Sequence, residues 1–239
     1  APIRRGKETV HTKWDLNTGI LSGDAMMILG YQCFESYDSN LYKNLTKLFN
    51  KTALEVCEGQ QYDVDFETRN DVTIPEYLKM ITYKTSVLVA AAMKMGALVA
   101  DANQKECEAI YNYGLNLGIA FQLQDDYLDT YGNAETFGKQ IGGDIIENKK
   151  TFLYLKTLEK SKSEDRLRLV ELYNSNSNSE DKIREVKDLF NKNQIPEIVK
   201  EEIEAYTSKA FEFLEELDII ESKKQVLKEF GLGLMRRTI

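Results

Sequence analysis

The sequence predicts an all-α protein that forms a single domain over residues 1–239. Segments in which apolar residues recur at helical spacing follow one another along the chain, and none shows the apolar–polar alternation of a surface strand. Only three prolines interrupt the chain, and the 42% of residues that are hydrophobic can supply one core for a domain of this length. We find neither an internal repeat nor a stretch with the composition of a linker.

The first 130 residues predict five helices, over residues 17–37, 40–58, 76–83, 84–102 and about 105–130. Thr73 and Pro75 stand just before the third helix, at positions where helix-start signals occur. The fourth helix has few polar interruptions, so we expect it to be central. Beyond Lys149 the chain is richer in Lys, Glu, Asp and Ser, which is typical of amphipathic surface helices.

Composition excludes several classes of function. A net charge of −8 argues against nucleic acid as the main partner, and no apolar run reaches the roughly 18 residues of a transmembrane span. His11 is the only histidine, which argues against a zinc site or a histidine-based triad. Cys33, Cys57 and Cys107 are odd in number and show no pairing pattern, so reduced thiols and a cytoplasmic location are expected.

Three carboxylates lie in one of the most apolar helical segments of the chain. Residues 114–121 are apolar on nearly all sides of a helix, and Asp125 and Asp129 follow on one face at i, i+4 spacing. Gln122 lies one turn back on that face, and Asp126 can reach the same point from the side. Like charges at this spacing repel, so a cation should offset the cost. Because Mg²⁺ takes carboxylate and phosphate oxygens, we predict a metal–diphosphate site rather than a solvated acidic helix end.

Asp125 lies deeper in the apolar helix than Asp129, which is followed three residues later by Gly132, where the helix should end. We therefore expect the loss of Asp125 to reduce activity more than the loss of Asp129. We also expect neither loss to lower the stability of the metal-free chain, because each relieves like-charge repulsion.

A glycine-rich loop that carries lysines follows at residues 137–150. Gly142 and Gly143 permit tight backbone turns, and Lys139 and Lys149 are compact positive charges suited to phosphate oxygens. A loop of this kind alone is usually a surface connection. Its position directly after the carboxylates favours a role in diphosphate binding.

Four motifs, in order, resemble those of the trans-isoprenyl diphosphate synthases, also called polyprenyl synthetases. The run from Gln122 to Lys149 looks like the second aspartate-rich region of that family, and Arg4-Arg5-Gly6 resembles the segment that follows its first. The other two matches are Gly59-Gln60-Gln61-Tyr62-Asp63, which resembles a Gly-Gln-x-x-Asp element, and Tyr83-Lys84-Thr85, which resembles a Lys-Thr helix start.

This resemblance implies an isoprenoid-synthase-type helical bundle around a central active-site cavity. It implies metal ligation by Asp125, Asp126 and Asp129. It implies catalytic roles for Lys84 at the diphosphate and for Thr85 and Gln122 near a developing carbocation. It assigns diphosphate and substrate binding to Arg4, Arg5, Gln60, Asp63, Lys139 and Lys149. Without the resemblance, Arg4 and Arg5 would be read as part of a loose terminus, and Gln60 and Asp63 as surface polar residues.

The implied reaction condenses isopentenyl diphosphate with an allylic diphosphate to make a longer trans-polyprenyl diphosphate. Several Mg²⁺ ions would bridge the carboxylates and the diphosphate, and the protein would be a homodimer formed through long apolar helices such as the one containing residues 20–33. No side-chain nucleophile is needed, which fits the absence of a Ser/His or Cys/His arrangement.

One departure from the family pattern leaves an alternative open. The first Asp-Asp-x-x-Asp motif should stand a few residues before Arg4, but the sequence begins at Ala1, so this motif and the helices before it are expected to be missing. A non-catalytic partner subunit of an active synthase is therefore the second hypothesis, against which the intact second motif argues. Terpene cyclases, which share the fold and the Mg²⁺ chemistry, are a distant third hypothesis. The spacing of the aspartates and lysines argues against them, because it is that of chain-elongating enzymes.

Overall fold

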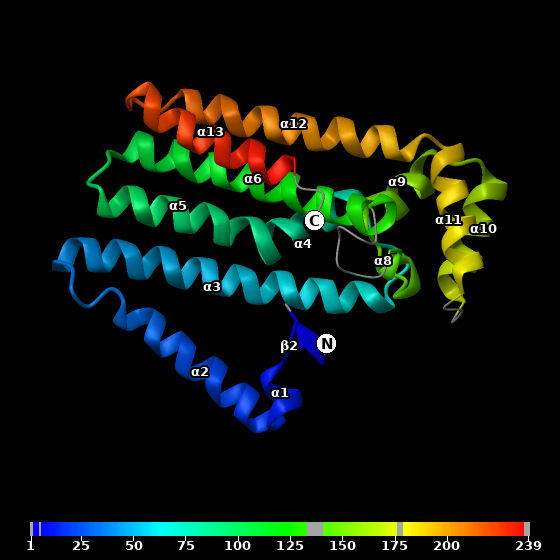
Figure 1. Ribbon diagram of the computed structural model, residues 1–239, viewed down its shortest axis with the longest axis horizontal. Coiled ribbons are helices and arrows are strands. Elements are labelled where there is room, and N and C mark those ends of the chain that lie inside the picture. The colour runs from blue at the N-terminus through cyan, green and yellow to red at the C-terminus, as the bar shows by residue number, and fades with distance from the viewer. Residues whose placement is uncertain (1, 5, 133–140, 176–178, 237–239) are drawn as a thin grey trace. The chain divides into compact units, whose positions relative to one another are not determined.

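The computed structural model describes residues 2–4, 6–132, 141–175 and 179–236 (Figure 1). Helices dominate these residues, and the prediction of an all-α protein is confirmed. The chain divides into two compact units, residues 1–50 and 51–239. A single domain over the whole chain stays a prediction. Within the described ranges, no helix combines the length and the apolar character that crossing a bilayer requires.

The first unit begins with a short hairpin that the sequence analysis missed. Strands β1 (Ile3–Arg4) and β2 (Lys7–Glu8) pair antiparallel, and Gly6 between them has a left-handed backbone with a φ of +72°. Two-residue strands are too short to show alternation in a sequence. The hairpin is followed by helix α1 (Val10–Lys13).

Helix α2 (Leu16–Gln32) begins after Asp15, whose side chain accepts a hydrogen bond from the backbone N–H of Thr18. It ends five residues before the predicted end at residue 37. None of its residues is buried. Its exposed large apolar side chains are Leu16, Ile20, Leu21, Met26, Met27, Ile28 and Leu29.

Helix α3 (Ser39–Thr68) starts in the first unit and continues ten residues beyond the predicted end at residue 58. The other helices of the second unit are α4 (Ile74–Ile81), the π-helical turn η1 (Thr82–Ser86), α5 (Val87–Val99), α6 (Gln104–Tyr131), α8 (Gly143–Ile146), α9 (Phe152–Lys160), α10 (Ser163–Asn174), α11 (Glu180–Lys192), α12 (Ile195–Glu215) and α13 (Glu221–Met235).

Helix α6 is the central helix of the second unit, with α12 and α5 packed along it (Figure 1). Asn103 and Glu106 form a capping box at its start, and Gly132 ends it as predicted. The prediction that residues 84–102 form the central helix is wrong. Only Val87, Ala90 and Ala91 of α5 are buried, because α5 presents one face to α6 and leaves Leu88 on the other face exposed.

Two apolar clusters cover opposite ends of α6. Tyr113 and Leu117 of its first half pack with Leu214 of α12. Leu123, closer to its C-terminal end, belongs to a larger cluster that includes Tyr77 of α4 and Phe152 of α9. The larger cluster supports the end of α6 that carries the aspartates.

The predicted start signals of α4 are confirmed: Thr73 and Glu76 form a capping box, and Pro75 occupies the first turn. Helices α4, η1 and α5 run on without a break. Thr85 therefore lies inside this run and does not cap a helix. The π-helical turn contains both Lys84 and Thr85, and such turns often occur at functional sites.

Two glycines allow neighbouring helices to approach this π-helical turn closely. A Cβ atom on Gly59 of α3 would lie 2.2 Å from the backbone nitrogen of Lys84. A Cβ atom on Gly118 of α6 would lie 2.7 Å from the Cα atom of Ser86. The turn is thus held between α3 and α6 by backbone contacts that no larger residue permits.

Candidate active site

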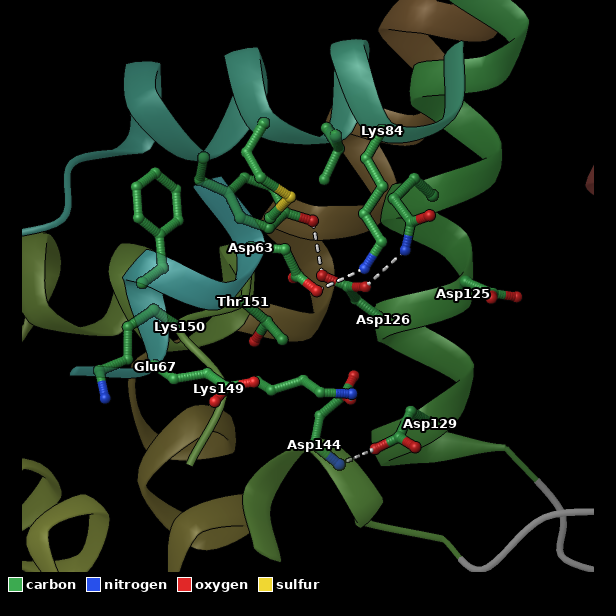
Figure 2. Close-up of a pocket in the computed structure, with 15 residues that line it drawn as sticks. Asp63, Glu67, Lys84, Asp125, Asp126, Asp129, Asp144, Lys149, Lys150 and Thr151 are labelled. Carbon is green, nitrogen blue, oxygen red and sulfur yellow. Dashed lines mark hydrogen bonds and ion pairs between the residues drawn. The ribbon is translucent and has the colours of Figure 1, made fainter. Parts of the chain in front are cut away.

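A pocket of about 160 Å³ opens beside the C-terminal half of α6 (Figure 2). Five elements, α3, α4, η1, α6 and α8, and the segment after α8 contribute side chains to it. The lining residues are Asp63, Phe66, Glu67, Tyr77, Met80, Ile81, Lys84, Gln122, Asp125, Asp126, Asp129, Asp144, Lys149, Lys150 and Thr151.

Most of the sequence-predicted site residues meet in this pocket: Asp63, Lys84, Gln122, Asp125, Asp126, Asp129 and Lys149 line it. Thr85 does not line it, but its hydroxyl donates a 3.2 Å hydrogen bond to Gln122 Oε1. Gln60 is exposed on α3 and is not part of the lining. Arg4 lies in β1 of the first unit, and Arg5 and Lys139 lie outside the described residues.

Asp126 is the buried carboxylate of the three, with 6% of its surface exposed. Tyr77 Oη donates a 2.5 Å hydrogen bond to its Oδ2, and Gln122 Nε2 donates a 3.2 Å hydrogen bond to its Oδ1. Burial raises the pKa of Asp126, the charge of Asp144 raises it further, and the two hydrogen bonds only partly oppose this, so that the pKa is about 8.

Asp125 and Asp129 are both half-buried, so the greater depth expected of Asp125 stays a prediction. Figure 2 shows the side chains of Asp125 and Asp126 leaving α6 in different directions. Asp129 Oδ2 accepts a 2.9 Å hydrogen bond from the backbone N–H of Asp144, and its backbone carbonyl accepts one from Gly142. Asp129 thus connects α6 to the start of α8.

Two lysines face the carboxylates across the pocket. Lys84 Nζ lies 2.6 Å from Asp63 Oδ2, and Lys149 Nζ lies 2.8 Å from Asp144 Oδ1 and 2.9 Å from Glu147 Oε2. Burial lowers the pKa of Lys149, but the charges and hydrogen bonds of its two partners outweigh this and raise it. Both ammonium groups contact acids that an anionic ligand could displace.

Sequence reasoning missed three residues of the pocket that bear on its chemistry. Asp144 stands inside the glycine-rich loop, between Lys139 and Lys149, so its position could have suggested it. Tyr77 and Lys150 carry no comparable signal. The hydroxyl of Tyr77 reaches Asp126 only because α4 packs against the end of α6.

The raised pKa of Asp126 predicts how stability depends on pH in the metal-free chain. Between about pH 4 and pH 8 the folded chain keeps a proton on Asp126 that the unfolded chain has lost, so stability falls as pH rises through this range. Asp126→Asn removes this titration. We expect its melting temperature in EDTA to exceed that of the unchanged chain by on the order of 5 °C at pH 8, with a smaller gain at pH 5. Thermal melts across this range test this, and parallel curves for the two proteins would contradict it.

The comparison with known proteins gives one consistent family. Residues 1–190 match the polyprenyl synthetase family. The chain is 39% identical over 174 residues to a short chain isoprenyl diphosphate synthase of Methanothermobacter thermautotrophicus, covering 72% of this chain and 54% of the relative. It is 42% identical over 160 residues to a geranylgeranyl diphosphate synthase of Methanosarcina mazei, covering 66% of this chain and 49% of the relative. The chain spans about half the length of these curated relatives.

Solved structures agree in fold. The structure of a geranylgeranyl pyrophosphate synthase, 53% identical, superposes with a TM-score of 0.92 over 99% of this chain and 74% of the other. The geranylgeranyl pyrophosphate synthetase from Pyrococcus horikoshii, 30% identical, gives a TM-score of 0.91 over 99% of this chain and 72% of the other. The predicted isoprenoid-synthase-type bundle is therefore confirmed.

Proposed function

This chain belongs to the polyprenyl synthetase family of trans-isoprenyl diphosphate synthases, and from that membership we propose that it is a prenyltransferase. The proposed reaction condenses isopentenyl diphosphate with an allylic prenyl diphosphate to give a longer trans-polyprenyl diphosphate. One observation carries the proposal: a single pocket places Asp125, Asp126 and Asp129 across from Lys84 and Lys149. Acidic groups for a divalent cation and basic groups for a diphosphate are thereby combined in one site.

The donor set fits Mg²⁺. Among the residues that the structure describes, no three acidic, histidine or cysteine side chains already converge as a ligand set. The carboxylates of α6 nevertheless offer the hard oxygen ligands that Mg²⁺ prefers. Burial is the main cause of the raised pKa of Asp126, and the charge of Asp144, which raises it further, is one that a cation would offset. When bound, Mg²⁺ would neutralise charge on the allylic diphosphate and so make it a better leaving group.

The side chains of the pocket would bind and orient the diphosphate. Lys84 and Lys149 would exchange their present partners, Asp63 and Asp144, for phosphate oxygens and stabilise the charge that develops on the departing group. The hydrogen-bonded pair of Thr85 and Gln122 would present oxygen atoms near the allylic carbon. Gln60, Arg4, Arg5 and Lys139 remain proposed substrate contacts on the strength of the motif resemblance.

The test is incorporation of radiolabelled isopentenyl diphosphate by the protein as its gene encodes it. Dimethylallyl, geranyl and farnesyl diphosphates serve as primers, with Mg²⁺ or with EDTA. We expect Mg²⁺-dependent formation of a longer prenyl diphosphate with at least one primer. Incorporation that occurs only after an active synthase is added would instead indicate the partner-subunit alternative. If this protein incorporated no label on its own and gave no incorporation after an active synthase was added, the proposed function would be refuted.

We further propose a homodimer. The apolar side chains that α2 exposes give this helix a surface suited to association, and obligate interfaces are hydrophobic and bury roughly 2,000 Å² or more. Sedimentation at micromolar concentration should give twice the chain mass. Ile28→Asp should shift the protein toward the monomer, whereas Asp24→Asn on the same helix should not. A monomeric unchanged protein would contradict the proposal.

A further inference from the structure

Lys182 of α11 is a buried ammonium group outside the pocket lining, with 3% of its surface exposed. The described residues give it no ion pair. Its Nζ donates a 2.7 Å hydrogen bond to Asn148 Oδ1 and a 3.3 Å hydrogen bond to the backbone carbonyl of Ser175. Burial lowers its pKa, and the charge of Lys150 lowers it further. An ammonium group buried without a counter-charge is costly, so its contact with Asn148 calls for a physical explanation.

Asn148 occupies a strained position just before the pocket lysine. It follows α8 and has a left-handed backbone with a φ of +56°, which asparagine tolerates better than other residues with a side chain. Lys182 holds its side chain, and Lys150 Nζ donates a 3.1 Å hydrogen bond to its backbone carbonyl. Two ammonium groups from different parts of the chain therefore fix this one residue.

The conformation of Asn148 determines where the next residue points. Lys149 follows directly, and its ammonium group lies in the pocket between Asp144 and Glu147. A change of Asn148 to the right-handed region would rotate the following peptide and move the Lys149 side chain away from its partners. In Figure 2, Lys149 extends from the segment after α8 toward the carboxylates.

We propose that Lys182 is a positioning residue that acts through Asn148 to direct Lys149 at the diphosphate. The inference rests on the proposed function only in taking the ligand of Lys149 to be a diphosphate. It extends the site to helix α11, which contributes no residue to the pocket lining. A purely structural lysine would instead stabilise the fold without affecting Lys149 or its ligand.

The test compares Lys182→Met, Lys149→Met and the double variant in the protein as its gene encodes it. Lys192→Met is the matched control, because Lys192 also lies on α11 but pairs with Asp165 and has no contact with Asn148. Two quantities are measured at a temperature where all variants are folded. One is the rate at which acetic anhydride modifies Lys149, followed by mass spectrometry. The other is the affinity for inorganic pyrophosphate in the presence of Mg²⁺, measured by calorimetry.

Lys182→Met should speed modification of Lys149 several-fold and weaken pyrophosphate binding about tenfold, the factor that corresponds to losing one hydrogen bond to a charged group. Lys192→Met should change neither quantity. The double variant should bind no more weakly than Lys149→Met alone, because Lys182 acts through Lys149. Additive losses, or unchanged values in Lys182→Met, would overturn the inference.

Asn148→Gly provides a second variant if Lys182→Met fails to fold. Glycine keeps the left-handed backbone without strain but cannot accept the hydrogen bond from Lys182. It should therefore reproduce the faster modification of Lys149, and unchanged modification would count against the inference. The modification rate does not depend on prenyl transfer. A protein that binds pyrophosphate through Lys149 but transfers no prenyl group would thus refute the proposed function and leave this inference standing.

Discussion

Gly59→Ala is expected to destabilise the chain by about 3 kcal/mol or more, although glycine-to-alanine changes in helices usually stabilise. The new Cβ atom would lie 2.2 Å from the backbone nitrogen and 2.8 Å from the Cα atom of Lys84. These are backbone atoms of the π-helical turn, so no flexible side chain can move aside, and α3 or the turn must shift. Because Lys84 and Thr85 lie in that turn, their alignment with the pocket should be lost as well.

Gly96→Ala is the matched control. Gly96 lies within α5, and a Cβ atom there would meet nothing within 4 Å. This change should raise stability by roughly 0.5 to 1 kcal/mol. Urea unfolding of both variants measures the difference, and prenyl transfer by Gly59→Ala reports the displacement of Lys84. If Gly59→Ala raised the free energy of unfolding as Gly96→Ala is expected to, the approach of α3 to η1 would not be as close as the structure indicates.

Asp125→Ala is expected to reduce turnover by roughly two to three orders of magnitude, because a carboxylate that would ligate the catalytic metal is lost. Its stability in EDTA should remain unchanged. Asp129→Ala should reduce turnover less, because Asp129 Oδ2 already accepts the backbone N–H of Asp144 and water can replace this carboxylate as a ligand of Mg²⁺. It should nevertheless lower the melting temperature in EDTA, because the link to the backbone N–H of Asp144 is lost.

This second expectation differs from the one based on sequence alone, in which neither change lowers stability. Turnover and melting temperature in EDTA decide between them, with Asp218→Ala, an exposed acid outside the pocket lining, as the control. Equal losses of turnover for the two variants would contradict the proposed ranking. An unchanged melting temperature for Asp129→Ala would show that the hydrogen bond to Asp144 does not stabilise α8.

Local signals predicted much of the fold. Thr73 and Pro75 open α4, and Gly132 ends α6, as the sequence predicted from short-range signals. The β1–β2 hairpin was missed because its strands are two residues long. The exposed side of α5 was missed because an apolar run does not reveal how much of a helix its neighbours cover.

The sequence by itself determined the helical elements, the family and the chemical groups of the site, because periodicity, capping and motif order are properties of neighbouring residues. Only the tertiary structure decided how those groups are used. Asp126 is the buried carboxylate because Tyr77, 49 residues earlier, donates to it from α4. Asp129 is linked to Asp144, and Lys182 to Asn148. Such contacts depend on which helices pack together, and the burial they produce sets the pKa values and orientations that the sequence leaves open.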